Sequence, residues 1–317
     1  MADGARRTLH RGLAAAVLLM AAAACAPATP AERIDFRQAG PEPPAAPIPS
    51  PRPNTIRMAV APVISPRETF NFNYRDLADY LGARLDMSAE LVPGKSYAEI
   101  NDLVRTGDVT LAFVCTNPYL QGRDDFGMEA LVVPEVNGAT LYYSYLITRT
   151  DAPFRSLADL RGHTFAFSDP LSNSGRLAPV YQLALRGETP DSFFSRYTFT
   201  QAHDNSIKAV AQGLVDAAAV DSLVFDYWVR TGSEYARKTK VIDQWGPFGI
   251  NPVVVHPRLD ADLKARLRAA LLAMHEDARG AAILQSLLID RFVVPDDRVY
   301  DSVRTMRAYM ASARLGG

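Results

Sequence analysis

The sequence GDVTLA at residues 107–112 returns as GLVDAA at residues 213–218, so both stretches have the pattern Gly-x-Val-x-x-Ala. Each stretch directly follows a helical pattern of apolar residues and opens a short apolar run. Glycine commonly ends a helix, and a short apolar run after it is typical of a buried strand. The repetition of this unit predicts two related α/β lobes rather than one large sheet.

Strand and helix patterns alternate on both sides of the repeated unit. Short apolar runs predict strands at residues 56–60, 111–114, 164–167, 197–200 and 217–220. Helical spacing of apolar residues predicts helices between them, including one over residues 174–186. This alternation, with apolar strands, is typical of parallel α/β sheets.

The C-terminal tail also has helical spacing, and its helices are expected to pack on the first lobe. That arrangement requires two crossings between the lobes, near residues 141–147 and near residues 250–255. We therefore expect lobe 1 to comprise residues 55–142 and 252–317, and lobe 2 to comprise residues 143–251. Paired crossing segments are typical of a hinged clamp with a ligand cleft between its lobes.

Residues 1–25 have the features of an export signal. Arginines precede an apolar run that ends at Ala24 and is too short to span a bilayer. The small residues before Cys25 indicate lipoprotein processing, in which Cys25 becomes the lipidated N-terminus. The alternative is a signal that is cleaved without lipidation. Residues 26–54 are rich in proline and are expected to form an extended linker, so the folded part is expected in the periplasm, tethered to the membrane by a lipid.

Composition and charge exclude several classes of function. The 317 residues are 48% hydrophobic, and 34 Lys and Arg against 35 Asp and Glu give a formal net charge of -1. There is no basic field to attract nucleic acid. The five histidines lack the spacing of a metal site, and Walker and dinucleotide-binding motifs are absent, so we expect no metal and no cofactor. The apolar run around Cys115 indicates a buried thiol rather than a reactive one, and we expect a monomer.

The stretch FSDPLSNSG at residues 167–175 is the first candidate site. A strand ends there, and a helix is predicted to begin near Ser174. Ligands of open α/β lobes bind beyond the carboxyl ends of strands, where the free N–H groups of a helix start attract anions. Ser172, Asn173 and Ser174 add three neutral donors, which suit a dehydrated oxyanion. These residue types are also ordinary helix N-caps, for which a single one suffices.

Two further polar residues follow neighbouring strands. His203 lies at the next junction between a strand and a helix, and Asp221 follows the strand at residues 217–220. With the serines they predict an anion site in which Asp221 recognises a ligand proton or amine. The alternatives are a surface histidine and a helix N-cap. Ser174, His203 and Asp221 also spell a hydrolase triad, but the Gly-x-Ser-x-Gly elbow is absent, so we expect no enzyme.

Tyrosines of the first lobe are candidates for closing on the ligand from the opposite side. Tyr97 precedes a helical pattern and Tyr119 follows a strand, although ordinary packing explains both positions equally well. Tyr142, Tyr143 and Tyr145 lie on the first crossing segment. Because alternate residues of an extended segment face opposite sides, only some of them can reach the cleft.

The central part of the chain resembles the periplasmic phosphate-, phosphite- and phosphonate-binding components of ABC importers. The resemblance is strongest in LADLRG at 157–162, FAF at 165–167, SNSGRLAP at 172–179, HDNSIKAV at 203–210, GLVD at 213–216 and Asp221-Ser222, and it extends loosely over 55–290. It implies a two-lobed type II periplasmic-binding-protein fold.

The resemblance also implies which residues hold the ligand. The family's Ser-Thr-Ser falls on Ser172-Asn173-Ser174, its cleft histidine on His203, its acidic residue on Asp221 and a first-lobe tyrosine on Tyr97. Asn173 departs from the usual threonine, and Cys115-Thr116-Asn117 stands where a glycine-containing turn is common.

The implied function is the capture of phosphate, phosphite or a phosphonate for an ABC permease in the inner membrane. The alternative is a periplasmic sensor or adaptor that presents a different small anion to a signalling receptor, since similar domains serve as sensors.

Overall fold

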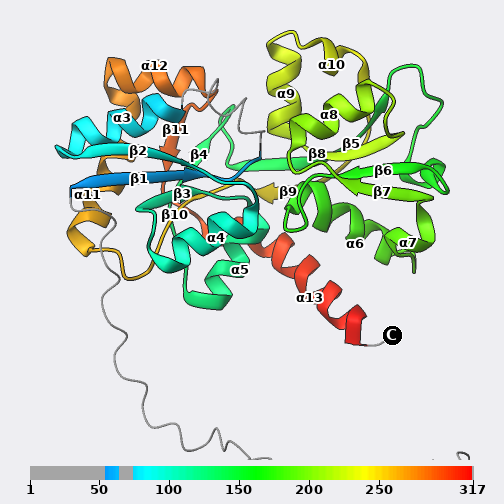
Figure 1. Ribbon diagram of the computed structural model, residues 1–317, viewed down its shortest axis with the longest axis horizontal. Coiled ribbons are helices and arrows are strands. Elements are labelled where there is room, and N and C mark those ends of the chain that lie inside the picture. The colour runs from blue at the N-terminus through cyan, green and yellow to red at the C-terminus, as the bar shows by residue number, and fades with distance from the viewer. Residues whose placement is uncertain (1–53, 64–73, 316–317) are drawn as a thin grey trace, which may run out of the picture. The chain divides into compact units, whose positions relative to one another are not determined.

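The computed structural model describes residues 54–63 and 74–315. The predicted export signal, Cys25 and the proline-rich linker up to residue 53 lie outside this part of the chain. The described residues form two mixed β-sheets with helices packed against them (Figure 1). Within the same residues, no helix has the length and apolar character needed to cross a membrane.

The first sheet has six strands in the order β11-β4-β10-β3-β1-β2. The strands are β1 (Thr55–Val60), β2 (Ser88–Pro93), β3 (Leu111–Phe113), β4 (Glu129–Glu135), β10 (Val253–Val255) and β11 (Arg291–Val293). β1 pairs in parallel with β2 and β3, as the alternation of strands and helices predicted. The other three strands complete the sheet in antiparallel pairs.

Five helices accompany the first sheet. They are α3 (Tyr74–Leu85), α4 (Tyr97–Thr106), α5 (Thr116–Phe126), α11 (Ala261–Leu272) and α12 (Ala278–Ser286). α11 and α12 both contact α3, and α4 contacts α5 (Figure 1). α4 shows why the sequence is helical here: the Ser96 hydroxyl accepts a hydrogen bond from the Glu99 N–H, Ile100 and Val104 are buried, and Gly107 ends the helix with a φ of 76°.

The second sheet has five strands in the order β7-β6-β8-β5-β9. The strands are β5 (Leu141–Arg149), β6 (Thr164–Phe167), β7 (Arg196–Phe199), β8 (Ala217–Asp221) and β9 (Thr239–Gly249). β6 lies between β7 and β8 and is parallel to both. The residues that follow these three strands therefore share one edge of the sheet.

Short helices connect the strands of the second sheet. They are α6 (Ala178–Ala184), α7 (Pro190–Phe193), α8 (His203–Ala211), α9 (Ser222–Arg230) and α10 (Glu234–Arg237). The predicted helix over 174–186 is divided, because residues Asn173–Leu177 form a single π-helical turn before α6. Single 3₁₀ turns lie at Leu157–Leu160, Met274–Glu276 and Asp297–Tyr300.

The chain passes from the first sheet to the second between β4 and β5 and returns between β9 and β10. The first crossing precedes the predicted 141–147, because these residues pair with β8 and β9 as part of β5. The last helix, α13 (Asp301–Leu315), contacts α5 beside the first sheet and α6 beside the second. The proposed lobes, 55–142 with 252–317 and 143–251, thus share this helix, which joins elements of both sheets.

Candidate functional site

The turn after β6 is held in place by bonds that its own sequence dictates. Pro179 has no N–H and so leaves the carbonyl of Gly175 without the donor that a regular helix would supply. That carbonyl instead accepts the Ser168 N–H (3.3 Å) at the end of β6. The Ser172 hydroxyl accepts the Gly175 N–H (3.0 Å). Ser172, Asn173 and Ser174 are consequently fixed in the interior, each with no exposed surface.

Gly175 lets the turn lie flat against its neighbours. A β-carbon at this position would lie 2.8 Å from the Ser168 β-carbon and 2.9 Å from Cε1 of His203, closer than side chains normally approach. Steric crowding alone therefore requires glycine at position 175. The close approach brings His203, the first residue of α8, directly against the turn.

His203 is a neutral imidazole that links Ser172 to Asp221. Its Nδ1 accepts the backbone N–H of Asp221 (3.0 Å), and its Nε2 lies 3.4 Å from the Ser172 hydroxyl. Burial lowers the pKa of His203 to about 3. Because Nδ1 is an acceptor and the ring is neutral, Nε2 carries the proton and donates towards Ser172.

Asp221 ends β8 and caps α9. One carboxylate oxygen accepts the Leu223 N–H (2.8 Å), and the other lies 3.4 Å from the Asn251 amide nitrogen. Burial raises the pKa of Asp221 to about 7. The capping role considered for this residue is thus present, and Asp221 also lines a cavity.

Elements of the first sheet meet the turn from the opposite side. The backbone N–H of Asn173 donates to the thiol of Cys115, which follows β3 (3.5 Å). The Asn173 amide donates to the hydroxyl of Tyr142 on β5, within its own sheet (2.9 Å). The ring of Tyr97 is fully buried, and burial and nearby Cys115 raise its pKa well above the ordinary value. The two departures from the family pattern, Cys115 and Asn173, are therefore in contact with each other.

Several buried oxygens in this region have no hydrogen-bond partner. Within residues 54–63 and 74–315, the unpartnered buried side-chain atoms are Tyr97 OH, Asn101 Oδ1, Ser168 Oγ, Asn173 Oδ1 and Ser174 Oγ. Buried polar groups are nearly always hydrogen-bonded, so each exception requires an explanation. Asn173 and Ser174 belong to the turn itself, and Tyr97 begins the helix that faces it.

The site has two sides, one formed by elements of the first sheet and the other by the turn and its neighbours in the second sheet. Direct hydrogen bonds join these two sides, in addition to the contact between Asn173 and the Cys115 thiol. A carboxylate oxygen of Asp169 accepts the Tyr97 N–H (3.1 Å), and the Asn117 amide donates to the Leu171 carbonyl (2.8 Å). The His203 N–H donates to the Val63 carbonyl (3.0 Å). These bonds hold a closed arrangement in which the site has no exposed surface.

Tyr119 lies apart from this group. Its ring packs against Tyr300, with 5.1 Å between the ring centres, and burial raises its pKa while Arg123 nearby lowers it. The structure therefore brings Ser172, Ser174, His203 and Asp221 together but gives Tyr119 a different environment. Sequence reasoning missed Tyr142 as a contact of Asn173; alternation along β5, with Tyr142 buried and Tyr143 half-buried, was the signal that separates the two.

The hydrolase alternative lacks its relay. His203 contacts Ser172 rather than Ser174, and it meets the backbone of Asp221 rather than the carboxylate. A triad needs the carboxylate on the imidazole and the imidazole on the nucleophile. In the part of the chain that the structure describes, no group of three metal-binding side chains is present either.

Comparisons with known proteins agree on one kind of protein. A family model described as "ABC transporter, phosphonate, periplasmic substrate-binding protein" matches residues 58–300. The phosphonates-binding periplasmic protein of Escherichia coli K12 is 28% identical over 155 residues, which cover 48% of this chain and 46% of that protein. The aligned stretch thus spans about half of that curated relative.

Two solved structures share the fold. A binding-protein component of an ABC phosphonate transporter from Pseudomonas aeruginosa has a TM-score of 0.75 and 24% identity, covering 80% of this chain and 85% of its own. PhnD1 from Prochlorococcus marinus, in complex with methylphosphonate, has a TM-score of 0.73 and 18% identity, covering 82% and 99%. These likenesses confirm the predicted two-lobed type II periplasmic-binding-protein fold.

Proposed function

The chain belongs to the family of periplasmic substrate-binding proteins of phosphonate ABC transporters, and from this premise we propose that it captures a small phosphorus oxyanion and delivers it to an ABC permease. The family consists of binding proteins, which confirms the prediction that the chain is not an enzyme. The ligand would be phosphate, phosphite or a phosphonate. The similar proteins give the sensor alternative no support.

The unpartnered buried oxygens around the turn carry this proposal. The hydroxyls of Ser174 and Tyr97 and the amide oxygen of Asn173 are fully buried and come from both sides of the closed arrangement. An oxyanion between them would accept from the two hydroxyls. A proton or substituent of the ligand would satisfy Asn173, because an amide oxygen is only an acceptor.

The electrostatics of the site favour recognition by fixed dipoles. His203 is neutral, and Asp221, with its pKa near 7, keeps its proton readily. A protonated Asp221 donates to a ligand oxygen, whereas an ionised one accepts from a protonated ligand. The site can therefore adjust to the protonation state of a phosphorus oxyanion.

Membership of this family places the folded part outside the cytoplasm. We further propose that Cys25 is lipidated and anchors the chain to the membrane, and that the protein acts as a monomer. The linker at residues 26–54 would hold the binding domain away from the membrane. Basic and acidic residues are nearly equal in number, with a formal net charge of -1, and this gives no basis for nucleic-acid binding.

Calorimetry on the full-length chain tests the proposal. Phosphate, phosphite and methylphosphonate are titrated into the wild type and into a Ser172→Ala/Ser174→Ala variant. Loss of two hydrogen bonds to an anion should weaken binding about 100-fold or more. Ser302→Ala/Ser312→Ala, which removes two exposed hydroxyls of α13, is the matched control and should bind as the wild type does. Absence of binding to all three compounds, or equal binding by the site variant, contradicts the proposal.

A further inference from the structure

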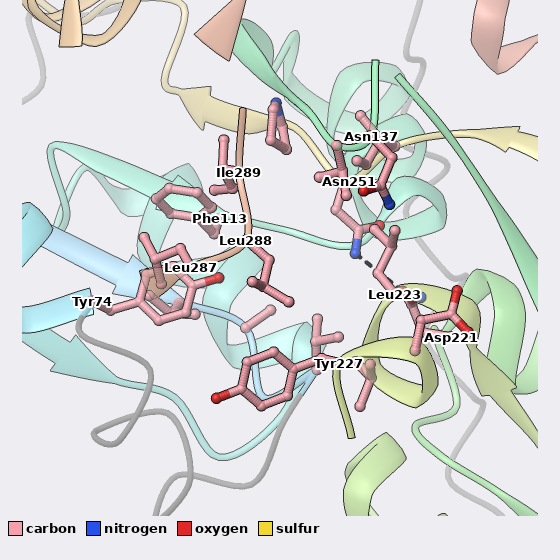
Figure 2. Close-up of a pocket in the computed structure, with 18 of the residues that line it drawn as sticks. Tyr74, Phe113, Asn137, Asp221, Leu223, Tyr227, Asn251, Leu287, Leu288 and Ile289 are labelled. Carbon is pink, nitrogen blue, oxygen red and sulfur yellow. Dashed lines mark hydrogen bonds between the residues drawn. The ribbon is translucent and has the colours of Figure 1, made fainter. Parts of the chain in front are cut away.

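A cavity of about 140 Å³ has Asp221 among its lining residues and is walled mainly by carbon. Its lining residues come from elements of both sheets. Its apolar walls include Phe113, Val114, Leu223, Val224, Leu287 and Ile289. Figure 2 shows Asp221 and Leu223 at one end of the cavity and Tyr74, Phe113 and Leu287 at the opposite end.

Asp221 connects this cavity to the anion site. This residue lines the cavity, and its backbone N–H donates to His203, which contacts Ser172. The connection is also made on the first-sheet side, because Val114 lines the cavity and the next residue, Cys115, touches Asn173. A ligand whose anionic end lies at the turn would thus point its remaining part past Asp221 into the cavity.

The two carboxyl groups of the cavity wall already have hydrogen-bond partners. The Asp221 carboxylate accepts the Leu223 N–H and faces the Asn251 amide. Asp226 is exposed at the rim and contacts the Tyr145 hydroxyl (3.4 Å). Burial also favours the neutral form of the Asp221 carboxyl. The remaining walls are mainly apolar and favour carbon.

The size of the cavity sets the size of that group. An apolar cavity of about 150 Å³ in another protein binds benzene. The present volume is comparable, so it suits about six carbon atoms. The cavity shares Asn137, Arg230, Leu288 and Ile289 with a second, more polar hollow that includes exposed His275, which gives a longer substituent a way out.

We propose that the preferred ligand is an organophosphonate with an aromatic or branched apolar substituent of about six carbons, bound with its phosphonate at Ser172–Ser174 and its substituent in the cavity beside Asp221. This inference rests on the proposed function, since it requires a phosphorus oxyanion at the turn. It goes further by assigning the cavity a role in specificity. Leu223 and Val224 of α9 both line the cavity, as does Asp221, which caps that helix.

Calorimetry on the full-length chain with phenylphosphonate, methylphosphonate and 2-aminoethylphosphonate tests the inference. Burial of the ring should make phenylphosphonate at least about tenfold tighter than either smaller compound. Leu223→Phe narrows the cavity and should reduce the ratio of phenylphosphonate to methylphosphonate affinity by about tenfold. Leu214→Phe is the control, because Leu214 is 65% exposed and lies outside the cavity lining, and it should leave the ratio unchanged.

A second readout guards against misfolding of the narrowed variant. Methyl resonances of Leu223 and Leu287 in the wild type should shift with phenylphosphonate and not with methylphosphonate. If methylphosphonate binds in a manner that depends on Ser172 and Ser174 but phenylphosphonate binds no tighter, the inference fails and the proposed function stands. The inference alone also fails if Leu223→Phe leaves the ratio of affinities unchanged. If none of the compounds binds, both the inference and the proposed function fail.

Discussion

Burial of the Asp221 carboxyl makes the stability of the ligand-free protein depend on pH. The folded state keeps its proton up to about pH 7, whereas the unfolded chain releases it near pH 3.9. Raising the pH from about 4 to about 7 therefore lowers the free energy of unfolding, and the loss is complete above this window. His203 acts in the opposite sense: its folded pKa of about 3 means that stability is lost as the pH falls below about 6.5.

Asp221→Asn should separate these two effects. Asparagine is also a good N-cap, so α9 keeps its cap while the buried ionisation is removed. We predict that the variant is more stable than the wild type at pH 8, by at most about 4 kcal/mol, and that the difference shrinks towards pH 4. Urea unfolding at several pH values measures this. Asp125→Asn, at an exposed position of α5, should show no such trend; a pH-independent difference for Asp221→Asn would contradict the role assigned to the buried carboxyl.

At the scale of elements, the π-helical turn at Asn173–Leu177 depends on glycine and proline together. Pro179 frees the Gly175 carbonyl for Ser168, and Gly175 leaves room for Ser168 and His203. Gly175→Ala should force these neighbours apart, which costs about 1–3 kcal/mol of stability and displaces the serines that face the ligand. Thermal unfolding and calorimetry with methylphosphonate measure the two effects.

A double variant tests whether the crowding is the cause. Ser168→Ala/Gly175→Ala removes the hydroxyl that lies closest to the added methyl group and should recover part of the lost stability. Ser168→Ala alone should cost little, because the Ser168 hydroxyl has no partner in the described residues. Equal losses for the single and double glycine variants would show that Gly175 matters for another reason.

The sequence predicts some features of the fold and of the site better than others. Ser172, His203 and Asp221 follow parallel neighbouring strands, so their approach to one another follows from topology. The division of the helix over 174–186 did not, because helical spacing does not report the tertiary bond from Ser168 to Gly175. The contact of Asn173 with Cys115 joins elements of different sheets, and such a contact depends on how the two sides close, which no local pattern encodes.

At the scale of the whole molecule, the Asp169 carboxylate links the second-sheet side of the site to the first-sheet side, because it is hydrogen-bonded to the start of α4. It accepts the Tyr97 N–H across the interface and the Leu171 N–H on its own side. Asp169→Asn leaves one acceptor for these two donors and weakens the closed state. Because closure and ligand binding are coupled, we predict a loss of affinity of about fivefold to tenfold. Small-angle scattering of the ligand-free variant should show a larger radius of gyration than the wild type.

Asp159→Asn is the matched control for that experiment. Asp159 also accepts two backbone N–H groups, from Arg155 and Ser156, but both lie on its own side of the molecule. This change should affect stability without altering the radius of gyration or the affinity. If both variants behave alike, the bond from Asp169 to Tyr97 does not contribute to closure.

The contact between Cys115 and Asn173 has a consequence for the chemistry of the thiol. Cys25 and Cys115 are the only cysteines of the chain, so Cys115 is the single thiol within residues 54–315. In the closed arrangement it is fully buried, and burial raises its pKa to about 12, which leaves almost no reactive thiolate. Opening of the cleft would bring it to solvent. Its rate of alkylation by iodoacetamide should therefore fall as ligand is added, so that one native side chain reports, without any added label, the fraction of molecules that are occupied.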